Sequence, residues 1–231
     1  MADRPKQLAF DLPLDPRYGR EDFLVSPSNE RAYGLIERWP DWPDTILRLV
    51  GPQGSGKSHL AAIWATRAHA WTIDASEVVG ARVPHLVSNG ALVIEDADRA
   101  ERDEAALFHL LNLARERGCS LLLTSTAPVE QWGLRTPDLL SRLRLAPSAA
   151  LEPPDDALLR SVLVKLFVDR QLVVDTSVID YLALRIERSL ARAGEVVAAI
   201  DREALSRGRR ITRVVAAEFL GMQGEAEDEG D

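Results

Sequence analysis

The residue types and spacing best suited to chemistry in this 231-residue chain lie in one glycine-rich segment. The segment, called the P-loop below, fits the pattern G-x-x-x-x-G-K-[ST] and consists of Gly51, Pro52, Gln53, Gly54, Ser55, Gly56, Lys57 and Ser58. Glycines let such a loop curl so that its N–H groups point inward at phosphate oxygens, and a helix N-terminus adds partial positive charge. The lysine of this pattern reaches the β- and γ-phosphates, while the serine hydroxyl binds Mg²⁺. The segment predicts a nucleotide-binding site. His59, the next residue, is included among the candidate binding residues, although a lone histidine on a helix is usually structural.

A pair of carboxylates follows the apolar run 92–94. A P-loop ATPase needs an acidic group at the end of a neighbouring strand, usually Asp near Mg²⁺ and then Asp or Glu as the base. Here Glu95 occupies the metal position and Asp96 the base position. Glu95 is one methylene longer than the usual metal ligand, and Asp96 is one methylene shorter than a glutamate base. Because phosphoryl transfer depends on positioning, this pair favours nucleotide binding over efficient hydrolysis. A plain surface acidic pair is the alternative, and the sequence leaves open which carboxylate faces Mg²⁺.

The lysines bear on the identity of the base. The chain has three, Lys6, Lys57 and Lys165, and none lies in the Asn-Lys-x-Asp pattern with which GTPases recognise guanine. Adenine is therefore the better prediction. The expected ligands are ATP or ADP with Mg²⁺, the metal being bound through Ser58 and Glu95.

The elements that must position these residues alternate between strands and helices in the first two thirds of the chain. Apolar runs predict strands, and helical periodicity predicts helices between them. The strands are expected at 45–50, 71–74, 91–95, 120–125 and 149–151, and the helices at 29–38, 57–69 and 103–117. Near-continuous apolar strands that alternate with helices favour a parallel sheet covered on both faces.

Strand signals stop after Glu152-Pro-Pro, and only helical periodicity follows. Helices are expected at 155–170, 176–188, 193–207 and 212–220, with Asp155 and Asp175 or Thr176 as N-caps. The predicted fold class is α/β, a five-stranded parallel sheet followed by a small all-α domain. The predicted domains are an extended arm at 1–22, a nucleotide-binding domain at 23–154, a helical lid at 155–222 and a disordered acidic tail at 223–231.

Composition and charge narrow the class of protein. Hydrophobic residues make up 46% and charged residues 28%, which excludes a disordered chain. No apolar run approaches the ~18–20 residues of a membrane helix, and no signal peptide is visible, so we expect a cytoplasmic protein. A net charge of −8 without a basic block disfavours independent tight DNA binding. The single Cys119 excludes an intrachain disulfide and a cysteine-based metal site.

In their order and spacing, these motifs resemble those of the AAA+ ATPases of the DnaA type, over roughly residues 7–220. The resemblance implies an AAA+ P-loop NTPase core and lid, with the adenine pocket near 23–32. It assigns a sensor 1 position on the strand 121–126, where Asp or Asn is commoner than Thr. It also assigns an arginine finger within 139–143 and a sensor 2 arginine within 188–192. The residues at these positions are Phe23, Val25, Asn29, Thr126, Arg142 and Arg192, with Arg144 as the next candidate for the finger.

The N-terminal arm resembles short peptides that bind the sliding clamp. Its residues Gln7, Leu8, Phe10 and Leu12 supply a hydrogen-bonding rim and apolar anchors. With a DnaA-type core, the resemblance implies a regulator that acts with the DNA polymerase III sliding clamp (beta subunit). It would stimulate hydrolysis of DnaA-bound ATP through Arg142 in trans, be at most a weak ATPase itself, and could form homo-oligomers. No segment resembles the helix-turn-helix domain of the initiator.

Two other functions remain open from the residues. The first is a helicase loader or DnaA-like remodelling ATPase with its own turnover, which would need contacts with single-stranded DNA or helicase, and no extra basic or zinc module is found for them. The second is a small-molecule P-loop kinase, but such enzymes usually insert the lid within the core. A clamp pull-down with and without residues 1–12 distinguishes the three.

Overall fold

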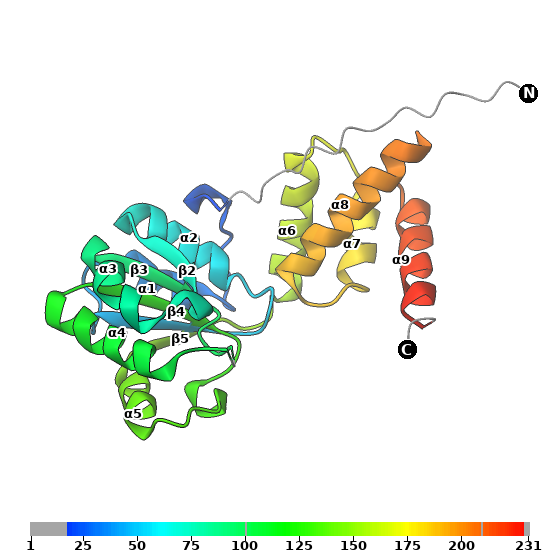
Figure 1. The fold of residues 1–231 in the computed structure, drawn as a ribbon. Helices are drawn as coiled ribbons and strands as arrows, with labels where there is room; N and C mark the ends of the chain where they lie inside the picture. Colours follow the sequence, from blue (N-terminus) through cyan, green and yellow to red (C-terminus); the bar gives the residue numbers. More distant parts are fainter. Residues whose placement is uncertain (1–17, 100, 209, 229–231) are drawn as a thin grey trace, which may run out of the picture. The chain divides into compact units, whose positions relative to one another are not determined.

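A computed structural model describes residues 18–99, 101–208 and 210–228 (Figure 1). The described residues fall into two compact units, the core unit and the helical unit, with the boundary between Pro153 and Pro154. The residues predicted to bind the clamp, Gln7, Leu8, Phe10 and Leu12, lie outside the described residues. Within the described part, no helix is both long enough and apolar enough to cross a membrane.

A five-stranded sheet forms the centre of the core unit. Its strands are β1 (Ile46–Val50), β2 (Trp71–Asp74), β3 (Ala91–Glu95), β4 (Ser120–Ser125) and β5 (Ser148–Ala150). They are ordered β2-β3-β4-β1-β5, and all neighbours are parallel. The predicted parallel sheet is confirmed. Because every strand runs the same way, the residues that follow β1, β3 and β4 emerge at one edge.

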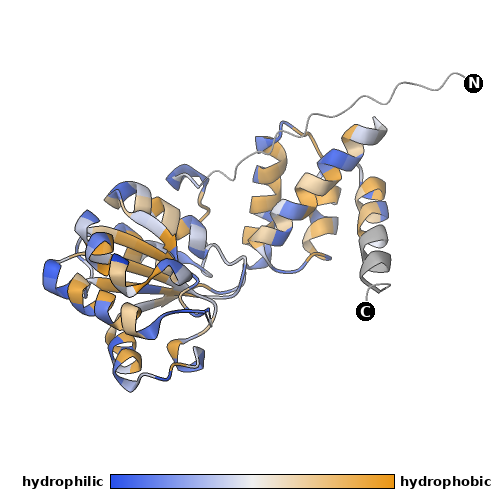
Figure 2. Cartoon of the chain, in the orientation of Figure 1, coloured by the Kyte–Doolittle hydropathy of each residue, from blue (hydrophilic) through white to orange (hydrophobic). Residues whose placement is uncertain are grey.

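Helices cover both faces of this sheet (Figure 1). They are α1 (Glu30–Glu37), α2 (Lys57–Ala68), α3 (Val83–Leu86), α4 (Glu104–Arg117) and α5 (Pro137–Leu145). Successive side chains of a strand point to opposite faces. In β4, Leu122 packs in one apolar cluster with α1 and α2, whereas Leu121 and Leu123 pack in a second with α3, α4 and α5. Figure 2 shows the result as apolar strands between helices whose outer sides are hydrophilic.

Several short elements of the core unit were not predicted. They are α3, α5 and 3-10 turns at Arg20–Asp22, Ala75–Glu77, Gly80–Arg82, Val87–Asn89 and Val129–Gln131. The first turn corrects the extended arm predicted for 1–22, because Arg20 forms an ion pair with Glu37 at 2.7 Å. Gly19 also hydrogen-bonds through its carbonyl to the His59 ring at 2.9 Å. Residues 18–22 therefore pack against the core unit.

Four helices make up the helical unit. They are α6 (Asp156–Asp169), α7 (Thr176–Ala183), α8 (Leu190–Arg207) and α9 (Arg213–Asp228), and they share an apolar cluster that includes Leu159, Phe167, Val178 and Val197. The expected N-caps are present: Asp155 accepts a hydrogen bond from Leu158 N–H and Asp175 accepts one from Ser177 N–H.

Three helix boundaries differ by three or more residues from those predicted. The helix expected at 176–188 ends at Ala183, and α8 starts at Leu190 because Ser189 caps it by accepting a hydrogen bond from Arg192 N–H. The last helix, α9, continues past the predicted end at Leu220 to Asp228 and takes in residues 223–228 of the predicted disordered tail. Those residues include Glu and Ala, which propagate helices, and no proline.

Candidate functional site

The P-loop joins β1 to α2 at the carboxyl edge of the sheet. Gly54 and Gly56 have φ of +73° and +100°, a region that residues with a Cβ rarely adopt. These two residues turn the chain so that α2 begins at Lys57. Lys57 is 7% exposed, and its ammonium donates hydrogen bonds to Gly51 O at 2.8 Å and to Pro52 O at 2.9 Å. The loop thus encloses the lysine through its own carbonyls.

Gly51 can only be glycine for a steric reason. A Cβ at this position would lie 2.4 Å from Leu151 O and 2.9 Å from Ser55 Oγ. The Leu151 carbonyl is backbone that cannot move aside, because Leu151 N–H also donates to Val50 O at 2.7 Å. The first P-loop glycine is therefore the point where the loop packs on the residue after β5.

Three carboxylates influence the charge of Lys57. Burial lowers the pKa of its ammonium below the ordinary value, and Asp96, Asp98 and Glu95 act in the opposite direction. Opposite charges within a partly buried site favour the charged form. The lysine cation accordingly lies at the N-terminus of α2, and acidic residues lie near it. A phosphate would balance the charge of the lysine and the helix N-terminus, and a divalent cation would balance that of the carboxylates.

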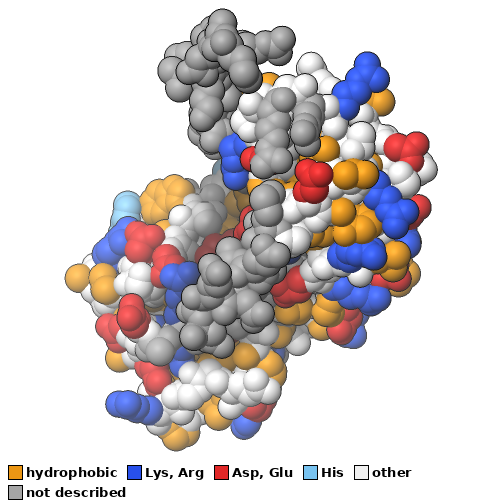
Figure 3. Space-filling view, turned by 90° about the vertical axis from the view of Figure 1, so that its right-hand side faces the viewer, with side chains coloured by type: hydrophobic (Ala, Val, Ile, Leu, Met, Phe, Trp, Pro, Cys, Tyr) orange, Lys and Arg blue, Asp and Glu red, His pale blue; other side chains and the backbone are white. Residues whose placement is uncertain are grey.

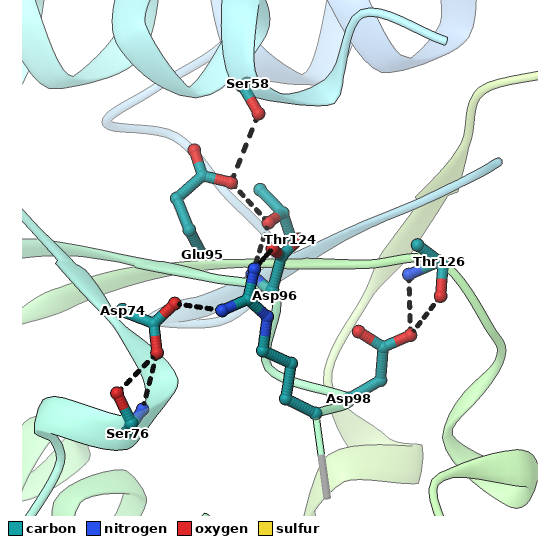
Figure 4. Close-up of polar contacts among 9 residues, drawn as sticks. Ser58, Asp74, Ser76, Glu95, Asp96, Asp98, Thr124 and Thr126 are labelled. Atoms are coloured by element: carbon teal, nitrogen blue, oxygen red, sulfur yellow. Dashed lines mark hydrogen bonds and ion pairs between the residues drawn. The ribbon is translucent and has the colours of Figure 1, made fainter. Parts of the chain in front are cut away.

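Glu95 is the carboxylate that faces the P-loop (Figure 4). Its Oε2 accepts a hydrogen bond from Ser58 Oγ at 3.4 Å and one from Thr124 Oγ1 at 2.6 Å. Burial raises the pKa of Glu95 despite these hydrogen bonds. Thr124 was missed from the sequence, although a polar residue directly after the buried run Leu121–Leu123 was the available signal.

Asp96 instead faces Arg99. Its backbone is left-handed, with φ of +50°, and its Oδ2 accepts a hydrogen bond from Arg99 Nη2 at 2.7 Å. The other terminal nitrogen of Arg99 donates to Asp74 Oδ2 at 3.0 Å, at the end of β2. Of the two carboxylates, Glu95 and not Asp96 hydrogen-bonds Ser58, the predicted magnesium ligand. The roles of Asp74 and Arg99 were not predicted.

Thr126, the predicted sensor 1 residue, is bound to a third carboxylate. Its N–H donates to Asp98 Oδ2 at 2.7 Å, its hydroxyl donates to the same oxygen, and Ala127 N–H adds a bond of 3.0 Å. Burial alone would raise the pKa of Asp98, but these hydrogen bonds outweigh it and hold the pKa below its usual value. Asp98 thus fixes the turn after β4, a role that sequence reasoning missed.

The residues predicted around the adenine base lie in and before the turn that leads into α1, and Phe23 contacts α2. Asn29 is buried, accepts a hydrogen bond from Ser26 N–H at 2.9 Å and donates one to Leu24 O at 3.0 Å. It therefore shapes the turn that leaves Val25 51% exposed. Phe23 stacks on Tyr33 and contacts the His59 ring edge-on at 5.1 Å. His59 accordingly has the structural contacts expected of a lone helix histidine.

The predicted arginines lie on two different units. Arg142 is on α5, between β4 and β5, with its guanidinium 5.1 Å from the ring centre of Phe108 on α4. Arg144, on the same helix, pairs with Glu130 at 3.0 Å. Arg192 lies in the first turn of α8 and donates to Glu195 at 3.3 Å.

Oxygen donors at the P-loop fit a magnesium ion. Ser58 and Glu95 present hydroxyl and carboxylate oxygens, the ligands that Mg²⁺ prefers, and this ion usually keeps waters and takes phosphate oxygens as well. In the described part of the chain, no group of three or more His, Cys, Asp or Glu residues could hold a metal by itself. The donor set therefore suits a cation that arrives with a nucleotide.

Curated relatives of this chain include replication initiators. No family model matches the chain. Its sequence is 27% identical over 218 residues to chromosomal replication initiator protein DnaA of Bacteroides fragilis (strain YCH46), covering 83% of this chain and 46% of that protein. The chain therefore spans about half the length of the curated relatives it matches.

Solved structures resemble the fold more fully. Domain III of the Thermotoga maritima replication initiation protein DnaA matches with a TM-score of 0.75 and 20% identity, over 90% of this chain and 98% of that domain. AMPPCP-bound DnaA from Aquifex aeolicus matches with a TM-score of 0.68 and 20% identity, over 83% of this chain and 67% of that one. The chain has the AAA+ fold of DnaA domain III, and the predicted fold class is confirmed.

Replacing the first P-loop glycine tests the steric account of this site. Gly51→Ala should lower the free energy of unfolding in urea by about 1–3 kcal/mol, the usual cost of forcing an atom into a packed site. Gly80→Ala is the matched control, because a Cβ there meets nothing within 4 Å and its φ is not positive. Equal unfolding midpoints for the two variants would contradict the proposed close contact with Leu151.

Proposed function

From the fold of DnaA domain III, we propose that this chain is an adenine-nucleotide-binding regulator of replication initiation. The regulator would be of the Hda type, acting with the sliding clamp to stimulate hydrolysis of ATP bound to DnaA. The observation that carries the proposal is the P-loop at the start of α2, with Glu95 facing Ser58, in a chain whose sequence is similar to that of the initiator.

Nucleotide binding is the first part of the proposal. Lys57 and the N-terminus of α2 would bind the phosphates, and Ser58 with Glu95 would hold Mg²⁺, which supplies positive charge against the phosphate oxygens. Adenine is supported by the Aquifex aeolicus structure, which has the same fold and contains AMPPCP. The exposed Val25 and the ring of Phe23, next to His59, would lie beside the base.

Action in trans is the second part. Arg142 is half-buried on α5, and its guanidinium lies over the face of the Phe108 ring, a weak interaction that a phosphate could replace. Arginine fingers supplied to a neighbouring subunit are worth ~10³–10⁵ in rate. Meanwhile Asp96, the base candidate of the chain itself, is paired with Arg99. This arrangement favours a chain that acts on the ATP of a partner more than on its own.

Clamp binding is the third part and rests on residues 7–12. This arm precedes Gly19, which is hydrogen-bonded to His59. A clamp ring offers several equivalent pockets, so homo-oligomers of the chain would bind by avidity. Independent DNA binding is not proposed, because the net charge is −8. On the face drawn in Figure 3, acidic and basic side chains are interspersed. A membrane partner is not proposed.

The second candidate is a DnaA-like remodelling ATPase or helicase loader with its own turnover. The similarity to the initiator itself favours it equally. The two candidates differ in whether hydrolysis occurs on this chain or on DnaA, and the finger experiment below separates them.

Lys57→Ala should abolish nucleotide binding because it removes the only cation in the P-loop. A ligand that binds only the folded state stabilises it, by about 2.7 kcal/mol at a concentration of 100 Kd. ADP with Mg²⁺ should therefore raise the melting midpoint of the wild type and of the control Lys165→Ala, but not that of Lys57→Ala. Equal shifts in all three proteins would refute the assignment of the site.

Arg142→Ala should retain nucleotide and clamp binding but lose about 10³-fold or more of the stimulation of DnaA-bound ATP hydrolysis. Arg142→Lys should restore little, since lysine lacks the planar fork. The assay is single-turnover hydrolysis on preloaded DnaA, with clamp on DNA. Full stimulation by Arg142→Ala together with loss in Arg144→Ala would move the finger to Arg144. Full stimulation by both variants would contradict the regulator.

Replacing Gln7, Leu8 and Phe10 together by Ala should eliminate clamp binding measured by surface plasmon resonance. Nucleotide binding should persist, because the arm precedes the described core unit. Undiminished clamp binding by the triple variant would exclude the arm as the docking segment.

A further inference from the structure

Arg99 joins two carboxylates that end neighbouring strands. Its Nη1 donates to Asp74 Oδ2 at 3.0 Å, at the end of β2, and its Nη2 donates to Asp96 Oδ2 at 2.7 Å, directly after β3. Asp74 is itself fixed by hydrogen bonds from the N–H and hydroxyl of Ser76, at 2.9 Å and 2.6 Å (Figure 4). The guanidinium is held from both sides, so it anchors Asp96 to β2.

The backbone of Asp96 is fixed as well. Its N–H donates to Thr124 Oγ1 at 2.9 Å, and its φ of +50° is in a region that non-glycine residues visit rarely. Thr124 in turn donates to Glu95. The two neighbouring carboxylates are thus held apart by their partners: Glu95 by Ser58 and Thr124, Asp96 by Arg99.

We propose that Arg99 restrains Asp96 in an arrangement of low hydrolytic activity and so limits ATP turnover by this chain. The inference rests on the ATP site proposed above. In hydrolysis, a water oxygen bonds to the γ-phosphorus while the bond to the β,γ-bridging oxygen breaks and its electron pair stays on ADP. The products are ADP, inorganic phosphate and a proton, and Asp96 is the candidate to orient the water and accept that proton.

The restraint acts on one oxygen, Oδ2, of the carboxylate that would accept the proton. A carboxylate oxygen that already accepts a charge-assisted hydrogen bond is a weaker proton acceptor and cannot turn freely toward water. Asp74 is hydrogen-bonded to the other terminal nitrogen of Arg99. A movement of Asp96 toward the P-loop would therefore break one of the two ion pairs of Arg99. Arg99 is therefore a positioning residue that acts through Asp96, and slow turnover keeps nucleotide on this chain.

Removing the restraint should increase hydrolysis. Single-turnover measurements with ATP and Mg²⁺ should give a rate about 2- to 5-fold higher for Arg99→Ala than for the wild type, the range expected of an exposed ion pair. The gain should vanish when Asp96→Asn is added. Arg99→Lys should be intermediate, because an ammonium cannot span two carboxylates as a planar guanidinium does. A general structural defect would lower the rate rather than raise it through Asp96.

Arg160→Ala is the control, since it removes another arginine that pairs with an aspartate, Asp180 at 3.0 Å, in the helical unit. It should leave the hydrolysis rate at the wild-type value. The affinity of every variant for a fluorescent ADP analogue should also equal that of the wild type, which separates binding from turnover.

A second measurement needs no nucleotide. A double-mutant cycle of Arg99→Ala and Asp96→Ala in urea should show a coupling of about 2- to 5-fold in the unfolding equilibrium constant. Three outcomes would overturn the proposed restraint but leave the proposed function standing. They are absence of coupling, an unchanged or lower hydrolysis rate in Arg99→Ala with normal affinity, and a rate gain that survives Asp96→Asn. Failure of the wild type to bind the ADP analogue would overturn both the restraint and the proposed function.

Discussion

The parallel direction of the strands is the constraint on which the site depends. Because β1, β3 and β4 run side by side in the same sense, the residues that follow them meet at one edge of the sheet. The P-loop after β1 and the carboxylate at the end of β3 are thereby brought within hydrogen-bonding reach, with Ser58 Oγ 3.4 Å from Glu95. An antiparallel neighbour would place one of these groups at the opposite edge.

Packing at the first P-loop residue connects this constraint to the shape of the loop. Gly51 lies so close to Leu151 that no side chain fits, and the positive φ of Gly54 and Gly56 turns the chain into α2. The loop can then enclose Lys57, whose pKa burial lowers while nearby carboxylates act to raise it. The result is a partly buried cation beside a helix N-terminus, a common setting for phosphate binding.

Three acidic side chains at this edge have three different partners. Glu95 accepts from Ser58 and Thr124, Asp96 pairs with Arg99, and Asp98 accepts from Thr126. Because their partners differ, their roles differ. Glu95 faces the P-loop, Asp96 is a restrained base candidate, and Asp98 fixes the turn after β4. The proposed regulator uses this division, since it needs to bind nucleotide more than to consume it.

The sequence by itself determined the P-loop, the parallel sheet, the acidic pair and the N-cap at Asp155, and it narrowed the next N-cap to Asp175 or Thr176. These depend on spacing and periodicity over a few residues, and local backbone geometry follows directly from such patterns. Only the tertiary structure decided that Glu95 and not Asp96 faces Ser58, that Thr124 and Asp98 belong to the site, and that Arg99 bridges to Asp74. Those contacts join positions about 25–37 residues apart. Strand order and side-chain direction decide which distant residues meet, and local periodicity does not encode either of them.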